Sequence, residues 1–128
     1  MRKVLIVDDE PVNRLVLLAM LEGLGATVVE ASDGFEALNA LKRDAYDLLL
    51  LDIHMPDLGG IEVASKVRAD PGPNRDIPIV AVTGDTSRTL GEYLTLGFDG
   101  LVEKPITQET IRLCLTARRR GQGGLLPG

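Results

Sequence analysis

The run Leu48-Leu49-Leu50-Leu51 places four apolar residues in succession and leads directly into the carboxylate of Asp52. An unbroken apolar run of this length is typical of a parallel strand that helices cover on both faces, because neither face then meets water. Periodicity alone also fits a short buried helix, so the surrounding segments must decide between strand and helix.

Short apolar runs of the same kind recur along the chain, at intervals that leave room for a helix between them. The candidate strands are Val4–Val7, Thr27–Val29, Leu48–Leu51, Ile79–Val82 and Leu101–Val102. Strands and helices that alternate through short connections imply right-handed crossovers and a parallel sheet. The pattern therefore predicts an α/β fold with a doubly wound, five-stranded sheet.

The segments between these runs carry helix signals. Pro11 suits the first turn of a helix that ends near Gly23 and Gly25, and Asp33 suits the N-cap of a second helix. The segment Asp70–Asn74 holds prolines and a glycine and is predicted to be an exposed connection. The apolar positions expected to mark the five helices are Leu15, Leu18, Ala19 and Met20; Ala37, Leu38 and Leu41; Ile61, Ala64 and Val67; Leu90, Tyr93 and Leu94; and Ile111, Cys114 and Leu115.

Composition narrows the class of protein. A chain of 128 residues suits one domain, and its net charge of −5 argues against a nucleic-acid partner. One cysteine, Cys114, excludes an intramolecular disulfide and indicates a reducing, cytoplasmic location. The N-terminal apolar run is too short for a signal peptide or a membrane span. Arg118–Arg120 are expected to complement the dipole of the last helix, and residues 118–128 to form a flexible tail or linker.

Polar side chains follow four of the predicted strands. Asp8 and Asp9 come after the first strand, Asp52 closes the third, Thr83 follows the fourth and Lys104 follows the fifth. Ligands of open parallel sheets bind beyond the C-terminal strand ends, so these groups should converge. Three carboxylates a few Å apart repel by about 4 kcal/mol per close pair at an effective dielectric of about 20, so they need a cation. All-oxygen ligands favour Mg²⁺.

Each of these residues alone has an ordinary explanation: a helix N-terminal acid, a strand-end cap, a turn hydroxyl or a surface lysine. Their joint placement favours a phosphoryl-transfer site instead. There Asp52 can attack phosphorus, while Lys104 supplies a point charge and Thr83 a hydrogen-bond donor. His54 stands near Asp52 without other histidines or cysteines, so it is a poor zinc ligand, and its backbone carbonyl matters more.

Four motifs resemble those of the response-regulator receiver family of two-component systems, over residues 2 to 117. They are Val7-Asp8-Asp9-Glu10, Leu51-Asp52-Ile53-His54-Met55-Pro56, Val82-Thr83-Gly84 and Glu103-Lys104-Pro105. The resemblance implies a flavodoxin-like (βα)5 fold with strand order 2-1-3-4-5, in a receiver domain of residues 1–117. Two segments look more like receivers attached to hybrid histidine kinases than like those of transcription factors. They are Pro11-Val12-Asn13-Arg14, with its Asn13, and Gly97-Phe98-Asp99-Gly100 before the lysine motif.

The same resemblance implies the roles of the site residues. Asp52 would accept a phosphoryl group from the phosphohistidine of a histidine kinase or histidine phosphotransfer protein. Asp9, Asp52 and the His54 carbonyl would hold Mg²⁺ directly, and Asp8 through water. Lys104 and Thr83 would contact the phosphoryl oxygens, and the Lys104-Pro105 peptide bond would be cis.

One departure from the family pattern keeps an alternative open. Leu101 stands where the family commonly has the Tyr or Phe that rotates inward on phosphorylation. A pseudo-receiver, an interaction module that is never phosphorylated, is therefore the alternative function. A metal-dependent phosphohydrolase is a third hypothesis, disfavoured because no separate acid/base group is evident. Family members differ in phosphoryl lifetime at the positions of His54 and Asp85, and the fourth helix, fifth strand and fifth helix are the expected partner surface.

Overall fold

The computed structural model describes residues 2–121. Strands and helices alternate in the order β1 (Lys3–Val7), α1 (Pro11–Gly23), β2 (Thr27–Ala31), α2 (Gly34–Arg43), β3 (Leu48–Asp52), α3 (Gly60–Ala69), β4 (Ile79–Thr83), α4 (Leu90–Thr95), β5 (Gly100–Glu103) and α5 (Gln108–Cys114). All five predicted strands are present, each one or two residues longer than predicted. Within residues 2–121, no helix has the length and apolar character needed to cross a bilayer.

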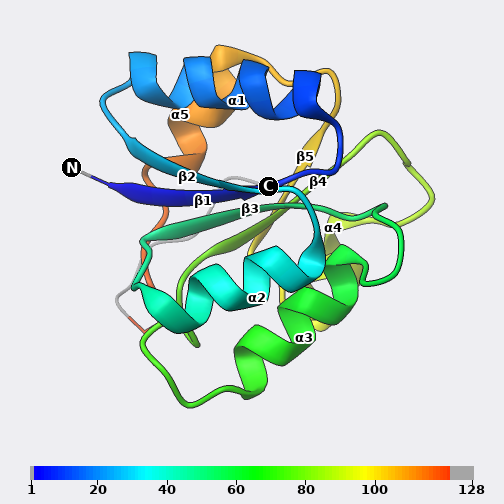
Figure 1. Cartoon of the computed structure of the whole chain (residues 1–128). Helices are drawn as coiled ribbons and strands as arrows, with labels where there is room; N and C mark the ends of the chain where they lie inside the picture. The colour runs from blue at the N-terminus through cyan, green and yellow to red at the C-terminus, as the bar shows by residue number, and fades with distance from the viewer. Residues whose placement is uncertain (1, 122–128) are drawn as a thin grey trace.

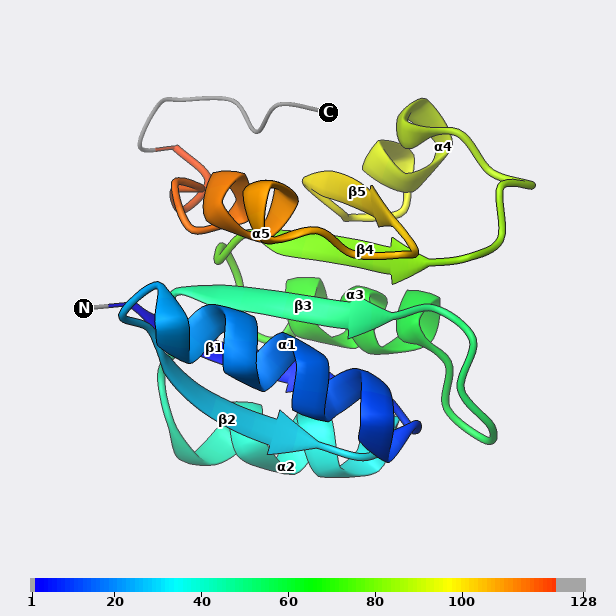
Figure 2. The ribbon, with the colours of Figure 1, turned by 90° about the horizontal axis from the view of Figure 1, so that it is seen from above.

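The strands form one parallel sheet in the order β2-β1-β3-β4-β5. Helices α1 and α5 cover one face, and α2, α3 and α4 cover the other (Figure 1). Seen from above, the strands point the same way, so their C-terminal ends lie along one edge (Figure 2). The predicted fold class and strand order are confirmed.

The core consists of two layers, one on each face of the sheet. The run Leu48–Leu51 is fully buried and supplies both layers in alternation: Leu48 and Leu50 face α1 and α5, and Leu49 and Leu51 face the other helices. This is why the run shows no polar alternation, since the pleat sends successive side chains to opposite faces and both faces are covered.

Two helices bury residues that differ in part from those predicted. In α1, Leu17 and Leu21 are buried, whereas Leu15 is 64% exposed, so the predicted marker positions were partly wrong. Apolar residues surround most of α1, so its spacing alone did not define the buried face. In α4, Tyr93 is buried as predicted, but Leu94 is 48% exposed. The ring of Tyr93 packs edge-on against Phe98, with centroids 5.5 Å apart, and this contact sets the buried side of the short helix.

The C-terminal segment also differs from the prediction. Helix α5 ends at Cys114, so Arg118–Arg120 do not lie in its last turn and the expected role toward its dipole was wrong. Arg119 instead donates to the carbonyl of Pro73, and Arg120 to the carboxylate of Asp99. Residues 122–128 of the expected tail lie outside the described residues.

Candidate functional site

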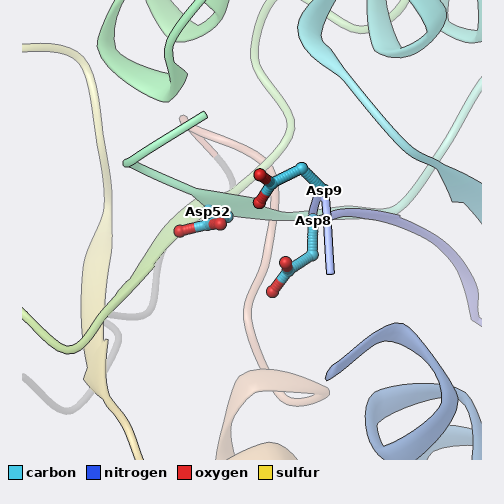
Figure 3. A group of neighbouring side chains, drawn as sticks. All are labelled: Asp8, Asp9 and Asp52. Atoms are coloured by element: carbon cyan, nitrogen blue, oxygen red, sulfur yellow. The ribbon is translucent and has the colours of Figure 1, made fainter. Parts of the chain in front are cut away.

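Three carboxylates meet at the C-terminal edge of the sheet. β1 and β3 are hydrogen-bonded neighbours with Val7 opposite Leu51, so the residues that follow or close these strands come together. Asp8, Asp9 and Asp52 each offer an oxygen within 4.8 Å of the others. Figure 3 shows their side chains gathered at one spot, with Asp8 and Asp9 from the end of β1 and Asp52 from β3. The predicted convergence of these acids is present in the structure.

Lys104, the residue that follows β5, lies beside this acidic group. Its Nζ lies 3.4 Å from Asp8 Oδ2 and 3.7 Å from Asp52 Oδ1. Asp8 and Asp52 are buried, with exposed fractions of 1% and 4%. Three carboxylates against one ammonium leave a formal charge of −2, which a divalent cation would cancel. The all-oxygen donor set and this charge fit Mg²⁺.

The environment of Asp52 disfavours its own charge. Burial is the largest cause, and with the neighbouring Asp8 and Asp9 it raises the pKa of Asp52 from 3.8 to about 6. Lys104 and the backbone N–H of His54 act in the opposite direction, lowering the pKa. Attraction from one lysine therefore does not offset burial beside two other acids, and additional positive charge would stabilise the ionised site.

Close backbone packing positions Asp52. Helix α3 begins directly against the end of β3, where a Cβ added to Gly60 would lie 2.4 Å from the Asp52 carbonyl oxygen. Only glycine permits that approach without displacing the backbone. The N–H of Gly60 donates to the carbonyl of Ile53 at 3.1 Å, which holds the loop after β3.

Thr83 ends β4, the strand beside β3. It is buried, and its Oγ1 accepts a hydrogen bond from the N–H of Asp85 at 3.0 Å. Because this bond uses an oxygen lone pair, the hydroxyl proton of Thr83 remains free to donate to a ligand. The neighbouring Lys104 is tied to the same residue, since its N–H donates to the Thr83 carbonyl at 2.9 Å.

A bridge links the loops that follow β3 and β4. His54 Nε2 lies 3.1 Å from Asp85 Oδ2, while the N–H of His54 donates to Asp52 Oδ1 at 3.3 Å. The His54 ring therefore points across to the next loop. Sequence reasoning singled out both residues but missed the contact between them, because thirty-one positions separate them.

Sequence reasoning also missed Arg14. From α1 its Nη1 donates to the carbonyl of Asp8 at 2.7 Å, and its Nε lies 3.4 Å from Glu30 Oε1. It supports the strand end that carries the acids. The sequence spacing of Asp8 and Arg14 did not predict this contact, because the start of α1 lies between them. The Lys104-Pro105 peptide bond is cis, as the resemblance implied.

Comparison with known proteins identifies the family. A family model described as the response regulator receiver domain matches residues 4–116. The chain belongs to this family. Among curated relatives, the receiver is 36% identical over 111 residues to the CAI-1 autoinducer sensor kinase/phosphatase CqsS of Vibrio cholerae serotype O1. That match covers 86% of this chain but only 16% of CqsS, so the chain spans a small part of that relative.

Solved receivers share the fold over nearly their whole length. The receiver domain of sensor histidine kinase PA1611 from Pseudomonas aeruginosa PAO1 is 32% identical with a TM-score of 0.79, covering 87% of this chain and 91% of that one; that structure has magnesium coordinated in its active-site cleft. The response regulator TrrA of Thermotoga maritima, solved with Mg²⁺ and beryllofluoride, is 30% identical with a TM-score of 0.80. The match covers 91% of this chain and 97% of that one.

Proposed function

We propose that this receiver accepts a phosphoryl group on Asp52 from the phosphohistidine of a histidine kinase or histidine phosphotransfer protein, with Mg²⁺ in the acidic site. The observation that carries this proposal is the buried Asp52 carboxylate, 3.7 Å from Lys104 Nζ and grouped with Asp8 and Asp9. Similarity to sensor kinases and to receivers solved with magnesium supports it.

The contacts of Asp52 support an assignment of the reacting oxygen to Oδ2. His54 N–H and Lys104 Nζ both approach Oδ1, which leaves Oδ2 to attack phosphorus. In the transfer an Oδ–P bond forms as the P–N bond of the phosphohistidine breaks, and the electron pair of that bond stays on the imidazole nitrogen. Lys104 and the free hydroxyl proton of Thr83 then stabilise the phosphoryl oxygens.

The metal has a definite place in this proposal. Asp9, Asp52 and the His54 carbonyl would hold Mg²⁺, and Asp8 would do so through water. Bound Mg²⁺ supplies positive charge that offsets the phosphoryl oxygens and the three carboxylates. Asp8 Oδ1 accepts the N–H of Glu10 at 2.9 Å, so its carboxylate already has a fixed orientation toward the site.

The surface beside the site suits a protein donor. Val12, Leu15 and Val16, in the first turns of α1, are exposed apolar residues directly after the acids of β1. Exposed apolar side chains that lie together often mark a protein contact. We infer that the donor approaches over this end of α1. Cys114 is buried, and burial raises the pKa of its thiol to about 11, which fits an unreactive thiol in a cytoplasmic protein.

The pseudo-receiver alternative has little support. It predicts that some part of the site would be missing, whereas the acids, Thr83 and Lys104 are all in place at the strand ends. Leu101 is half-buried and packs against the core layer beneath α4, so it fills space without offering a polar tip that can turn inward. This difference concerns how phosphorylation is transmitted, not whether Asp52 can react.

Intact mass spectrometry after incubation with acetyl phosphate and Mg²⁺ tests the proposal. A gain of about 80 Da that disappears in Asp52→Asn and without Mg²⁺ would support it. Asp57→Asn is the matched control, because Asp57 is an exposed acid of the same loop. If neither acetyl phosphate nor a phosphorylated histidine kinase domain produces the gain of about 80 Da, the proposed function is wrong and the pseudo-receiver hypothesis replaces it.

A further inference from the structure

Asp99 lies in the turn between α4 and β5, at the end of the sheet opposite the acidic site. Three donors share its carboxylate. Oδ2 accepts the N–H of Ile79 at 2.8 Å and the guanidinium of Arg68, and Oδ1 accepts Nε of Arg120 at 2.9 Å. One carboxylate thus joins the last turn of α3, the start of β4 and the chain beyond α5.

Residues 118–121, named here the C-terminal strap, are held by more than this ion pair. The N–H of Arg120 donates to the carbonyl of Asp76 at 2.8 Å, and its Nη2 donates to that of Gly97 at 3.1 Å. Arg119 also donates to the carbonyl of Pro73. Figure 2 shows this part of the chain turning beyond α5, near the end of the sheet from which β4 starts. The strap is therefore docked on the domain.

The two arginines that share Asp99 are anchored unequally. The Arg68 side chain is 13% exposed and also donates to the carbonyls of Gly97 and Ile77. The Arg120 side chain is 41% exposed. Losing Arg120 leaves the half-buried Arg68–Asp99 pair intact, whereas losing Asp99 would leave a half-buried arginine without its acid. The Arg120 contact is therefore the more exposed and more easily replaced of the two.

The turn that receives the strap is rigidly joined to α4. Phe98 donates its N–H to the Tyr93 carbonyl at 3.1 Å and packs its ring edge-on against the Tyr93 ring. Gly97 has φ +98°, and a Cβ there would lie 3.3 Å from Arg68 Cγ, so the turn has one conformation that suits glycine. A displacement of α4 must therefore move Gly97, whose carbonyl accepts Nη2 of Arg120, whereas Asp99 is also held to Ile79 at the start of β4.

The other end of α4 is connected to the site. The loop before α4 starts after Thr83, whose Oγ1 accepts the N–H of Asp85. Asp85 in turn contacts His54, two residues after Asp52. If a ligand on Asp52 accepts the hydroxyl proton of Thr83 and draws this residue closer, the loop that starts there and α4 would move with it. Small shifts at a site are passed on in this way when packed elements move as units.

We propose that the C-terminal strap is a latch, whose docking through Arg120 on the α4–β5 turn opposes the position of α4 that an occupied Asp52 site favours. The inference rests on the proposed function, because it needs a ligand on Asp52. Coupling between two sites is reciprocal. Occupying the site therefore loosens the strap, and removing the strap anchor tightens the site.

The test uses Mg²⁺ with beryllofluoride, a tetrahedral stand-in for a phosphoryl group, on the ¹⁵N-labelled chain followed by NMR. The Arg120 amide reports docking directly, because it donates to Asp76. We expect its hydrogen exchange to speed up about fivefold on ligand addition, and Arg120→Ala to bind the ligand about fivefold more tightly, at the low end of usual site–site couplings. Arg118→Ala is the control, since it removes the same charge from a side chain with no hydrogen bond or ion pair within residues 2–121.

The outcomes separate the latch from the proposed function. If the amides around Asp52 respond to the ligand while Arg120 exchange and the affinity of Arg120→Ala stay unchanged, the strap is only a structural tether. If Arg120→Ala is unfolded, the claim of a releasable anchor is wrong. If no amide around Asp52 responds in the unmodified chain or in either variant, the latch and the proposed function fail together.

Discussion

Asp52→Asn should make the metal-free receiver more stable at pH 8. Burial and the neighbouring acids raise the pKa of Asp52 from 3.8 to about 6, so the folded protein resists ionising this group. Each pH unit of such a difference corresponds to about 1.4 kcal/mol, so the ionised carboxylate costs the folded state roughly 3 kcal/mol. Asparagine removes the charge but keeps a polar group in the pocket, so we expect a gain of about 1–3 kcal/mol.

The sign follows from proton linkage. Between about pH 4 and pH 6 the folded chain binds more protons at Asp52 than the unfolded chain, so this residue lowers stability as pH rises through that window. The full cost is present above pH 6 and absent below about pH 4. The advantage of Asp52→Asn should therefore be largest at pH 8 and shrink on acidification.

Urea denaturation in EDTA at pH 8, 6 and 4 measures this effect. The midpoint of Asp52→Asn should rise with an unchanged slope, which reports stability and not a change in exposed surface. Asp57→Asn removes a nearby exposed acid and should leave the midpoint nearly unchanged. Added Mg²⁺ should stabilise the unmodified chain more than Asp52→Asn and so narrow the gap, because binding to the folded state adds stability. A variant that is equally or less stable than the unmodified chain at pH 8 in EDTA would refute the electrostatic reasoning.

Three further predictions concern the site and its support. Gly60→Ala should lower stability by about 1–3 kcal/mol in thermal unfolding, since its Cβ would lie 2.4 Å from the Asp52 carbonyl oxygen; an unchanged midpoint would contradict that packing. Lys104→Gln should slow phosphorylation by acetyl phosphate at least tenfold in intact-mass time courses. The same change should tighten Mg²⁺ binding a few-fold in calorimetric titrations, because it removes a positive charge 3.4 Å from Asp8. Weaker Mg²⁺ binding would contradict this prediction. Asp85→Asn should weaken the 3.1 Å bridge to His54 and shorten the phosphoryl half-life severalfold as water gains access to Asp52, whereas an equal or longer half-life would show that the bridge does not shield the site.

The amino-acid sequence was sufficient to predict the sheet and the location of the site. Runs such as Leu48–Leu51 contain no polar side chain, and only a strand between two helical layers keeps all of their side chains away from water. Once the strands are parallel, their C-terminal ends share one edge, so Asp8, Asp52 and Lys104 come together despite up to ninety-six positions between them. These inferences follow from local pattern and topology, which the order of residues specifies directly.

Only the tertiary structure determined which of several equivalent faces is buried and which distant polar groups meet. α1 is apolar on most sides, and contact with the sheet selected Leu17 and Leu21 over Leu15. The bridge from His54 to Asp85 and the docking of Arg120 on Asp99 depend on loop conformations and on the path of the chain beyond α5. No periodicity in the sequence predicts such contacts, because long polar side chains bond with whichever partner the packed backbone brings within reach.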